Sequence, residues 1–565
     1  MAFQVSPGVQ IKEIDATNVI PAVSSSIGGF AGSFNWGPTD EVCLVGSENE
    51  LLEKFGTPDA NTAKYFLTAA SFLKYGNALK VVRVSSTHLN ASAAGGGQLV
   101  KNAEDYNNNY SASGISGKGN WVAKYPGVLG NSLKVSMVTA GVSTSNYNAW
   151  AFKGNFDAQP GTSDFAKDLG KTSAADELHV AVIDEDGAIS GTPNTVLETF
   201  AFVSQASDVK NADGTSNFYK DVINSQSEWI YWANHDSSLT DAGETVASQS
   251  GAMTTNTAVI DNSLTSGTDD NAPTVGEIAL GYDLFEDAET VDVNLLFAVP
   301  DANGANTIAN DLISIATARK DCMAFVSPPL EDSVGASAPS TDVLAFANSL
   351  TSSSYASCDS GAVYVYDKYN DVYRYIGASG HIAGLCANAD NVADAWFSPA
   401  GVNRGQLLGI TKLAYNPTKA QRDELYKGRV NPLVSFPGQG TMLFGDKTLL
   451  SRPSAFDRIN VRRLFIVLEK AIATAAKAQL FEFNDEFTRA QFKNLVEPFL
   501  RDVKGRRGIT DSLVVCDGTN NTGQVIDSNR FVADIFIKPA RSINFITLNF
   551  IATRTGVEFS EISGQ

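Results

Sequence analysis

The stretch "VDVNLLFAVPDANGANTIANDLISIATARKDCMAFVSPP", residues 291–329, predicts the central architecture of this chain. It begins with a nearly continuous apolar segment, VDVNLLFAVP, and ends with a second one, CMAFVSPP. Between them, Ile308, Leu312, Ile315 and Ala316 recur at the spacing of one helical face. Strands that are apolar on both faces and alternate with a helix are typical of a parallel βαβ crossover. We therefore expect an α/β domain in the middle of the chain.

A second αβ unit lies nearer the N-terminus. Residues 41–56, EVCLVGSENELLEKFG, predict a strand followed by a short helix, with Ser47 and Glu50 as a possible capping box. Residues 62–76 carry apolar side chains at helical spacing, and ALKVVRV follows as a strand. We expect residues 21–86 and 286–420 to form the α/β middle domain together.

Residues 87–285 differ from both flanks. From 87 to 120, Gly, Ser, Asn and Ala dominate, which indicates an exposed loop or a reduced insertion. From 121 to 285 the pattern predicts short strands separated by turns, in a segment rich in Asp, Ser, Thr and Asn. This composition suits a β-rich outer protrusion domain that is well exposed to solvent.

The last third shows the most regular pattern. Residues 459–481 predict a long amphipathic helix. Residues 484–508 predict another, with Asn484 or Asp485 as its N-cap and Pro498 as a source of a kink. Strand-like segments follow, so residues 421–545 are expected to form an inner α+β domain with two long helices against a small sheet. The whole chain is predicted to be multidomain, combining α/β and α+β domains.

Both ends of the chain predict isolated strands. Near the N-terminus, SPGVQIKEID places Val9, Ile11 and Ile14 in a pattern typical of a half-buried strand, and no tight turn follows. Near the C-terminus, GVEFSEI carries Val557, Phe559 and Ile562. Because a strand must satisfy its backbone donors and acceptors, the segments 1–20 and 546–565 need partners. Those partners lie either in a distant sheet of the same molecule or in another molecule.

Charge is distributed unevenly along the chain. The formal net charge is −20. Residues 401–565 hold 23 Lys and Arg against 16 Asp and Glu, a balance of +7, whereas residues 1–400 have a balance of −27. One interpretation is an acidic, soluble surface around a nearly neutral C-terminal domain. The other is that the C-terminal part faces an acidic partner.

Composition excludes several classes of protein. No apolar run approaches the roughly 18 residues of a membrane helix, and the N-terminus lacks the pattern of a secretory signal. Five scattered cysteines without a C-x-x-C pair favour free thiols in a reducing compartment. We expect that the chain does not insert into a membrane and that it is synthesised in a cytoplasm.

No pattern predicts catalysis or a cofactor. The histidines, His88, His179, His235 and His381, have no metal-ligand spacing. GQGTMLFGDKT approaches a phosphate-binding loop, but Asp446 stands where the lysine belongs. The basic run KGRRG at 504–508 has no interleaved aromatics, so it is a weak nucleic-acid signal. The chain is therefore expected to be neither an enzyme nor a metal or cofactor carrier.

Several blocks of the sequence resemble the tail sheath proteins of contractile-tailed bacteriophages of the myovirus type. These blocks are SPGVQIKEID, GGFAGSFNWGPTDEVCLVGSENELLEKFG, FLKYGNALKVVRV and AKYPGVLGNSL in the first third, and WFSPAGVNRGQLLGI, RVNPLVSF, NVRRLFIVLEKAI and EFNDEFTRAQFKNLVEPFLRDV nearer the C-terminus. They occur in the order found in the family and span both ends of the chain. The resemblance is weakest at 87–120, where larger members carry an extra outer domain. The short Gly/Asn-rich stretch here indicates that this domain is missing, so functions tied to it are not carried over.

The resemblance implies a structural subunit that forms stacked hexameric rings around a tail tube and contracts to drive the tube through the host envelope. It implies that Val9, Ile11, Ile14, Val557, Phe559 and Ile562 take part in strand exchange between subunits. It also implies an inner C-terminal domain, in which Lys493, Arg501, Lys504, Arg506 and Arg507 are candidates to face an acidic tube.

The same resemblance implies partners and a location. The partners are further copies of the chain, the tail tube protein, and the baseplate and tail terminator proteins, with no direct nucleic-acid contact. The location is the virion, after assembly in the host cytoplasm.

Three other interpretations remain open at this point. The first is the sheath of a bacterial contractile injection system or tailocin, which delivers no genome. The second is an enzyme or binding module with an α/β core, which would need a site of converging polar residues. The third is an adhesin or surface-layer protein, which would usually carry an export signal.

Overall fold

The computed structural model describes residues 24–85, 87–270, 272–300 and 306–544. The chain divides into two compact units. Among the described residues, the larger unit lies within 24–395 and 399–470, and the smaller unit comprises 396–398 and 471–544. The six predicted strand-exchange residues, Val9, Ile11, Ile14, Val557, Phe559 and Ile562, lie outside the described residues.

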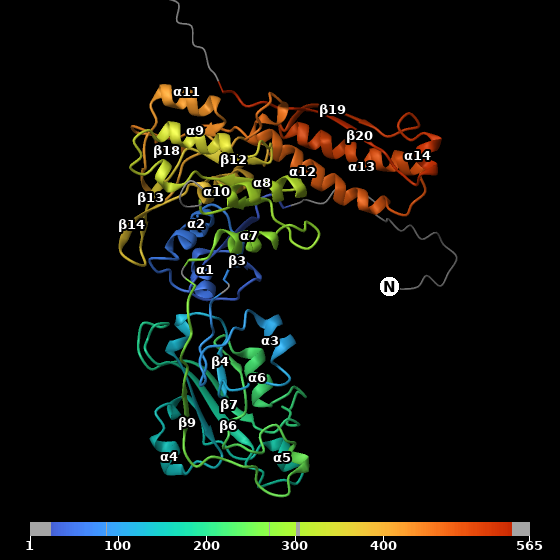
Figure 1. Ribbon diagram of the computed structural model, residues 1–565. Coiled ribbons are helices and arrows are strands. Elements are labelled where there is room, and N and C mark those ends of the chain that lie inside the picture. Colours follow the sequence, from blue (N-terminus) through green and yellow to red (C-terminus); the bar gives the residue numbers. More distant parts are fainter. Residues whose placement is uncertain (1–23, 86, 271, 301–305, 545–565) are drawn as a thin grey trace, which may run out of the picture. The chain divides into compact units, whose positions relative to one another are not determined.

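A seven-stranded sheet is the centre of the larger unit (Figure 1). Its strands, in spatial order, are β16 (Val430–Asn431), β12 (Ala356–Asp359), β11 (Met323–Val326), β10 (Leu295–Phe297), β1 (Gly28–Gly32), β3 (Leu79–Arg83) and β2 (Val42–Val45). All neighbours are parallel except β2 and β3. The predicted βαβ unit is confirmed, because β10 and β11 pair in parallel on either side of α8 (Thr307–Arg319). The sheet extends past residue 420, since β16 pairs with β12.

Seven helices of the larger unit come from the segments that supply the sheet. They are α1 (Glu48–Phe55), α2 (Ala63–Leu73), α7 (Val275–Asp283), α8, α9 (Pro339–Ser349), α10 (Ser379–Val392) and α11 (Lys419–Lys427). The helix predicted at 62–76 is α2. The capping box expected at Ser47 is only half formed. Ser47 accepts a hydrogen bond from the Glu50 amide, but the Glu50 carboxylate accepts from the amide of Gly46 instead of Ser47.

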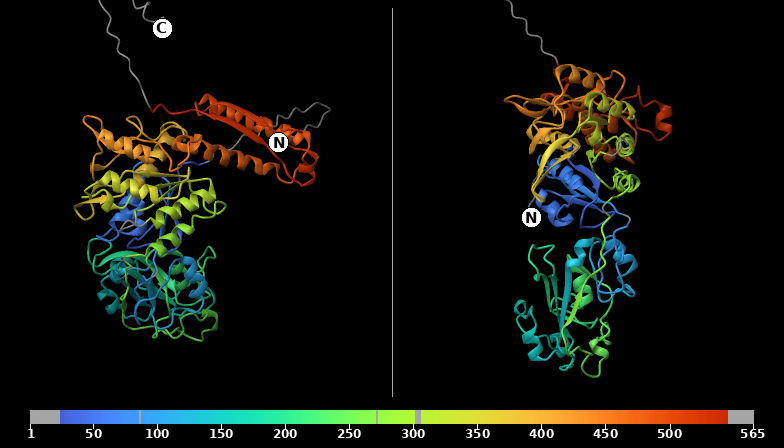
Figure 2. Two further views of the ribbon diagram at one scale, coloured as in Figure 1. Left: turned by 45° about the horizontal axis from the view of Figure 1, so that its top comes forward. Right: turned by 60° about the vertical axis from the view of Figure 1, so that its left-hand side comes forward.

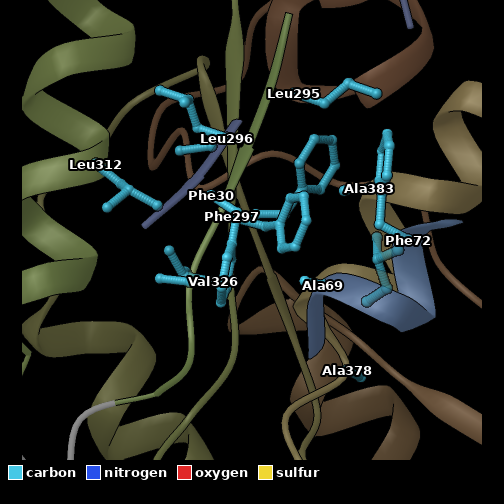
Figure 3. Close-up of a cluster of buried hydrophobic side chains, with 14 of the residues drawn as sticks. Phe30, Ala69, Phe72, Leu295, Leu296, Phe297, Leu312, Val326, Ala378 and Ala383 are labelled. Atoms are coloured by element: carbon cyan, nitrogen blue, oxygen red, sulfur yellow. The ribbon is translucent and has the colours of Figure 1, made fainter. Parts of the chain in front are cut away.

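Aromatic rings fill the space between the sheet and α2 (Figure 3). Phe297 of β10 stacks on Phe72 of α2, with ring centroids 5.3 Å apart and planes at 19°. Phe30 of β1 lies 5.3 Å from the same ring of Phe297. All three are fully buried, so the central strands are covered by large apolar side chains, as expected for a parallel sheet.

A three-stranded antiparallel sheet adjoins this core. Its order is β14 (Val372–Ile376), β13 (Val363–Asp367) and β15 (Ile410–Leu413). Val363, Val365 and Ile376 belong to the same buried cluster as the central sheet. A separate hairpin of β17 (Leu433–Phe436) and β18 (Gly440–Leu443) follows later in the chain.

Residues 87–285 have their own sheets and, together with Trp36, a buried cluster separate from that of the central sheet. Four antiparallel strands lie in the order β7 (Thr195–Ser204), β6 (Glu177–Asp184), β5 (Leu133–Thr139) and β9 (Ile260–Ser263), and β4 (Trp121–Ala123) pairs with β8 (Ile230–Trp232). The helices here are α3 (Ala103–Asn109), α4 (Thr144–Ala149), α5 (Asp164–Asp168) and α6 (Tyr219–Gln226). The helix α7 also falls within these residues, but its Ile278 and Tyr282 belong to the buried cluster of the central sheet. The β-rich prediction is confirmed, and α3 lies in the segment that was expected to be a loop.

The long helix α12 (Ile459–Ala476) is divided between the two units. Up to Lys470 it belongs to the larger unit, where Arg462 lies over the ring of Tyr355 and Arg463 pairs with Asp390 at 2.7 Å. From Ala471 it belongs to the smaller unit. The expectation that both long helices pack against one small sheet therefore holds for α13, whereas much of α12 packs elsewhere.

The smaller unit is built on one helix and one hairpin. The helix α13 (Glu486–Gly505) lies along the antiparallel pair β19 (Ile509–Val515) and β20 (Asp534–Pro539), as the left view of Figure 2 shows. The short helix α14 (Gly523–Asp527) lies in the connection between these strands.

Candidate assembly interface

The helix α13 presents one buried stripe. Asp485 is its N-cap and accepts a hydrogen bond from the Thr488 amide at 2.8 Å, which confirms that prediction. The buried residues recur every three or four positions, so they lie on one face of the helix. They are Thr488, Phe492, Val496, Leu500 and Val503. This stripe fixes which side of α13 can meet other molecules.

The sheet beside α13 is thin and incompletely covered. Its buried face holds Val514, which is paired with Ile535. No residue of β20 is buried. Exposed and half-buried positions alternate along the whole strand. On the open face, Leu513 and Phe536 are register partners. Within the part of the chain that the structure describes, no third strand pairs with β19 or β20. Both outer edges of this sheet therefore have backbone groups available for another strand.

A second apolar surface lies between α12 and α13. Leu480, Phe481, Phe483 and Phe487 all expose most of their side-chain area to solvent. The sequence pattern did not predict this group. One signal for their exposure was present in the sequence. The aromatic residues in 480–487 precede the buried stripe of α13 and do not share its spacing.

The predicted basic residues lie on or just after α13, and several are paired within the chain. Lys493 pairs with Glu497 at 3.6 Å, and Lys504 pairs with Asp511 at 3.6 Å. Arg506 pairs with Asp502 at 3.3 Å and lies over the ring of Trp396. Arg501 and Arg507 are exposed, and among the described residues no ion pair involves either one. The structure thus brings these five cations to one region, while acidic neighbours offset three of them.

The four histidines, of which His88, His179 and His381 are buried and His235 is half-buried, do not form a site. Burial lowers the pKa of His235 to about 4 and that of His381 to about 3, so both imidazoles are neutral at pH 7. His88 and His179 also have pKa values lowered by burial. The described residues contain no group of three or more His, Cys, Asp or Glu side chains that could hold a metal ion.

The glycine-bearing stretch near Asp446 is a strand rather than a phosphate-binding loop. Gly440–Leu443 is β18 in a hairpin. Asp446 is buried, accepts a hydrogen bond from the Tyr426 hydroxyl, and lies 3.7 Å from the Arg458 guanidinium. Among the described helices, none is long and apolar enough to span a membrane.

Comparison with known proteins gives one consistent family. Family models match at residues 26–84 (tail sheath protein Gp18 domain III N-terminal region), 274–449 (phage tail sheath protein central domain) and 451–553 (phage tail sheath C-terminal domain). The tail sheath protein of Vibrio phage KVP40 is 34% identical, and that of Enterobacteria phage T4 is 33% identical. Each alignment covers 99% of this chain and 99% of the relative.

Solved structures share the fold at low sequence identity. The sheath tail protein Lin1278 from Listeria innocua gives a TM-score of 0.53 at 12% identity, over 92% of this chain and 96% of that one. The sheath of an extracellular contractile injection system, in its contracted state, gives 0.52 at 13% identity, over 98% and 99%. The full-length identity to phage relatives favours a phage over an injection system as the source. The chain belongs to the tail sheath proteins of contractile-tailed bacteriophages and is a structural component of the virion.

Proposed function

We propose that this chain polymerises into stacked hexameric rings around the tail tube. The polymer contracts from a metastable extended state and drives the tube through the host envelope for genome delivery. New contacts between subunits supply the energy, and no nucleotide is required. Assembly takes place in the host cytoplasm, and the ends of the polymer meet the baseplate and tail terminator proteins.

The observation that carries this proposal is the incomplete sheet of the smaller unit. A two-stranded hairpin is marginally stable by itself and needs further strands or a helix packed against it. Here α13 packs against one face only, and the other face and both edges have no cover among the described residues. β19 and β20 have open outer edges among the described residues, and their open face carries Leu513 and Phe536. A subunit with such a sheet gains stability when strands from its neighbours complete it.

The added strands come from both ends of neighbouring chains. We assign this role to the arms at 1–20 and 546–565, with Val9, Ile11, Ile14, Val557, Phe559 and Ile562 as the apolar contacts. Each backbone hydrogen bond contributes about 0.5–1.5 kcal/mol net. Several bonds per arm form a tether that survives while the rest of each subunit rotates.

The tube is the second partner of the inner domain. Lys493, Arg501, Lys504, Arg506 and Arg507 supply the contact with an acidic tube surface, and the +7 balance of residues 401–565 supports this assignment. Arg501 and Arg507 have the largest share, because both are exposed and neither forms an ion pair among the described residues.

Each domain takes its own radial position in the polymer. Residues 21–86 with 286–420 act as the middle domain, 87–285 as the outer protrusion and 421–545 as the inner domain. The alignments with the KVP40 and T4 relatives run over 682 and 665 positions, more than the 565 residues of this chain, so those relatives contain segments that this chain lacks. We place the reduction at 87–120.

Electron microscopy of the purified, concentrated protein tests the proposal. Striated hollow cylinders are expected for the intact chain, and deletion of residues 1–16 should abolish them while leaving a folded monomer. A deletion variant that forms normal cylinders would show that this arm does not link subunits. If the intact chain stays monomeric both alone and with the tube protein, the proposal that its arms and its open sheet join subunits is wrong.

A further inference from the structure

The chain is fastened to α12 just before it enters the central sheet. The guanidinium of Arg463 donates a hydrogen bond to the carbonyl of Ser25 at 3.1 Å, and the Ser25 hydroxyl donates to Asp390 at 2.7 Å. Further along α12, the Lys470 ammonium donates to the carbonyl of Ser24 at 3.5 Å. Arg463 and Lys470 are seven positions apart, so they lie on one face of the helix. We call these five residues the entry clamp.

Arg463 is the buried part of the entry clamp. Besides the Ser25 carbonyl, its guanidinium contacts the carboxylate of Asp390 at 2.7 Å and the carbonyl of Cys386 at 3.0 Å. Asp390 and Cys386 both belong to α10, so one guanidinium ties the entering chain to two helices. Replacement of a buried ion pair by apolar residues of similar volume is often neutral or even stabilising. The stability of the core alone therefore does not require a charged pair at this place.

Lys470 is the outer part of the entry clamp. Its ammonium also pairs with Asp292, which comes three residues before β10. The Lys470 side chain is 18% exposed and that of Asp292 is 45% exposed, so this contact lies near the surface. The carbonyls of Ser24 and Ser25 are thus held by two cations of the same helix.

The entry clamp lies between two segments with different tasks. Residues 1–20 are the arm assigned above to strand exchange, and β1 begins at Gly28. β1 is an interior strand of the central sheet, paired in parallel with β10 on one side and with β3 on the other. Gly28, Gly29 and Gly32 are three of its five residues, and glycine weakens the hold of a strand. A pull on the arm that reached β1 would act on a weakly held strand in the middle of the core.

The order of these segments along the chain decides where a pull is resisted. Force applied to the arm meets Ser24 and Ser25 before it meets β1, and at that point the chain is bonded to α12. The helix α12 continues beyond Lys470 into the smaller unit, which contains the sheet proposed to accept arms from neighbouring chains. Tension can therefore pass from the arm into α12 without passing through β1.

We propose that the entry clamp is a mechanical device, which transfers tension from the N-terminal arm to α12. It keeps the central sheet out of the path of the force while neighbouring subunits move apart and rotate. Arg463 and Lys470 are the residues that hold the chain, and Asp390 positions the guanidinium of Arg463. This inference rests on the proposed function, because the neighbouring sheets that bind the arms supply the tension.

Single-molecule force measurements on the full-length monomer test the clamp without the polymer. One handle is attached at the N-terminus and the other at Ala478, an exposed position just beyond α12. The lifetime of the larger unit before it unfolds is measured under a constant pull. Arg463→Met with Asp390→Asn removes the charged hydrogen bonds of the clamp. This lifetime should then fall at least about tenfold, because one hydrogen bond to a charged group contributes roughly that factor.

The direction of the pull supplies the internal control. Glu53 of α1 is exposed, and a handle at Glu53 in place of the N-terminal one pulls on the larger unit without loading the entry clamp. Under this second pull, the double variant should lose lifetime only as far as it loses free energy of unfolding in urea. A matched variant, Arg374→Met with Asp367→Asn, removes another buried ion pair of the same unit and should respond alike to both pulls. Equal responses of the clamp variant to the two pulls would overturn the inference.

A milder variant covers the case in which the double variant folds poorly. Lys470→Gln changes a contact near the surface, so the subunit should keep its fold. Its lifetime should be shorter than that of the intact chain under the N-terminal pull and equal to it under the pull from Glu53. Equal lifetimes under both pulls would count against the clamp.

The measurements separate this inference from the proposed function, because they need no cylinders. Cylinders formed by a chain whose clamp has no mechanical effect would refute the inference and leave the polymer intact. A chain whose clamp resists the pull but that never forms cylinders would contradict the proposed function. It would also remove the tension that the clamp is proposed to carry, and the inference would fall with it.

Discussion

Leu513 on β19 and Phe536 on β20 lie directly opposite each other on the open face of the small sheet, and each is 58% exposed. An apolar cross-strand pair on a solvent-facing surface contributes little to the isolated subunit. It becomes useful when another element covers it, because burial of apolar area contributes about 25 cal/mol per Å².

The first prediction concerns this pair. Leu513→Ser with Phe536→Ser should change the free energy of unfolding of the monomer by less than about 1 kcal/mol, because both side chains are already exposed. Cylinder formation should require about tenfold more protein, because the assembled state then buries less apolar area at this sheet. Urea unfolding and sedimentation measure the two quantities. Ile526→Ser, an exposed apolar position in α14, is the matched control and should affect neither. A large loss of monomer stability would mean that the pair acts within the subunit.

The second prediction concerns the buried ion pair of Arg463 and Asp390. The guanidinium and carboxylate are 2.7 Å apart, and the two side chains are 3% and 10% exposed. Arg463→Met should lower the free energy of unfolding by about 3–5 kcal/mol, since it leaves a buried carboxylate without its cation. The double variant Arg463→Met, Asp390→Asn should recover much of that loss in urea titrations. If the single and double variants unfolded alike, the cost would come from lost packing and from the lost hydrogen bonds to the carbonyls of Cys386 and Ser25, and not from the unpaired charge.

The third prediction concerns pH. Asp359, at the end of β12, is buried and accepts hydrogen bonds from the Ser327 hydroxyl and the Gly361 amide. Burial raises its pKa from 3.8 to about 7. The stabilisation from the neutral acid is fully present below the unfolded pKa and is lost as pH rises through the folded pKa. Between pH 5 and pH 8 the intact chain should lose about 2–3 kcal/mol relative to Asp359→Asn.

Paired unfolding curves of these two proteins at several pH values check the third prediction. His235 and His381, whose pKa values are lowered, change stability below pH 6.5, and they do so equally in both proteins. A difference between the proteins that stays constant from pH 5 to pH 8 would contradict a raised pKa at Asp359.

The fourth prediction concerns the tube. Arg501→Gln with Arg507→Gln should weaken binding of the sheath to the tube and reduce its dependence on salt, because exposed charge contacts are screened at high ionic strength. Cosedimentation with purified tube at 50 and 300 mM NaCl, for instance, measures both effects. Lys493→Gln is the control with the smaller expected change, since Lys493 is already paired with Glu497. Binding that does not respond to salt would argue for an apolar contact, for which Phe481 and Phe483 are the available residues.

Local patterns in the sequence predicted those helices and strands whose own residues decide which of their faces are buried. The crossover around α8 could be recognised because β10 and β11 are apolar on both faces, and the N-cap at Asp485 because a carboxylate precedes a helical stripe. The alternating tyrosines of residues 364–375 were also visible in the sequence, but alternation alone does not say which face a core will cover.

Other features depend on residues that are far apart in the chain. Arg462 and Arg463 are buried near the start of α12, although charged residues at a helix end usually face solvent. Their partners, Tyr355 and Asp390, come from other segments and cannot be read from the local pattern. The strand β16 has only two residues, too few to give a periodic signal, and it is recognised through its pairing with β12.

The open edges of β19 and β20 have a genetic consequence under the proposed strand exchange. A chain that keeps this sheet but lacks its arms would accept strands from its neighbours and donate none. Incorporated into a growing polymer, such a chain would act as a terminator, as a dideoxynucleotide does in DNA synthesis. A small fraction of it, made in the same cell, would shorten most tails, so a defective allele would be dominant over the intact one.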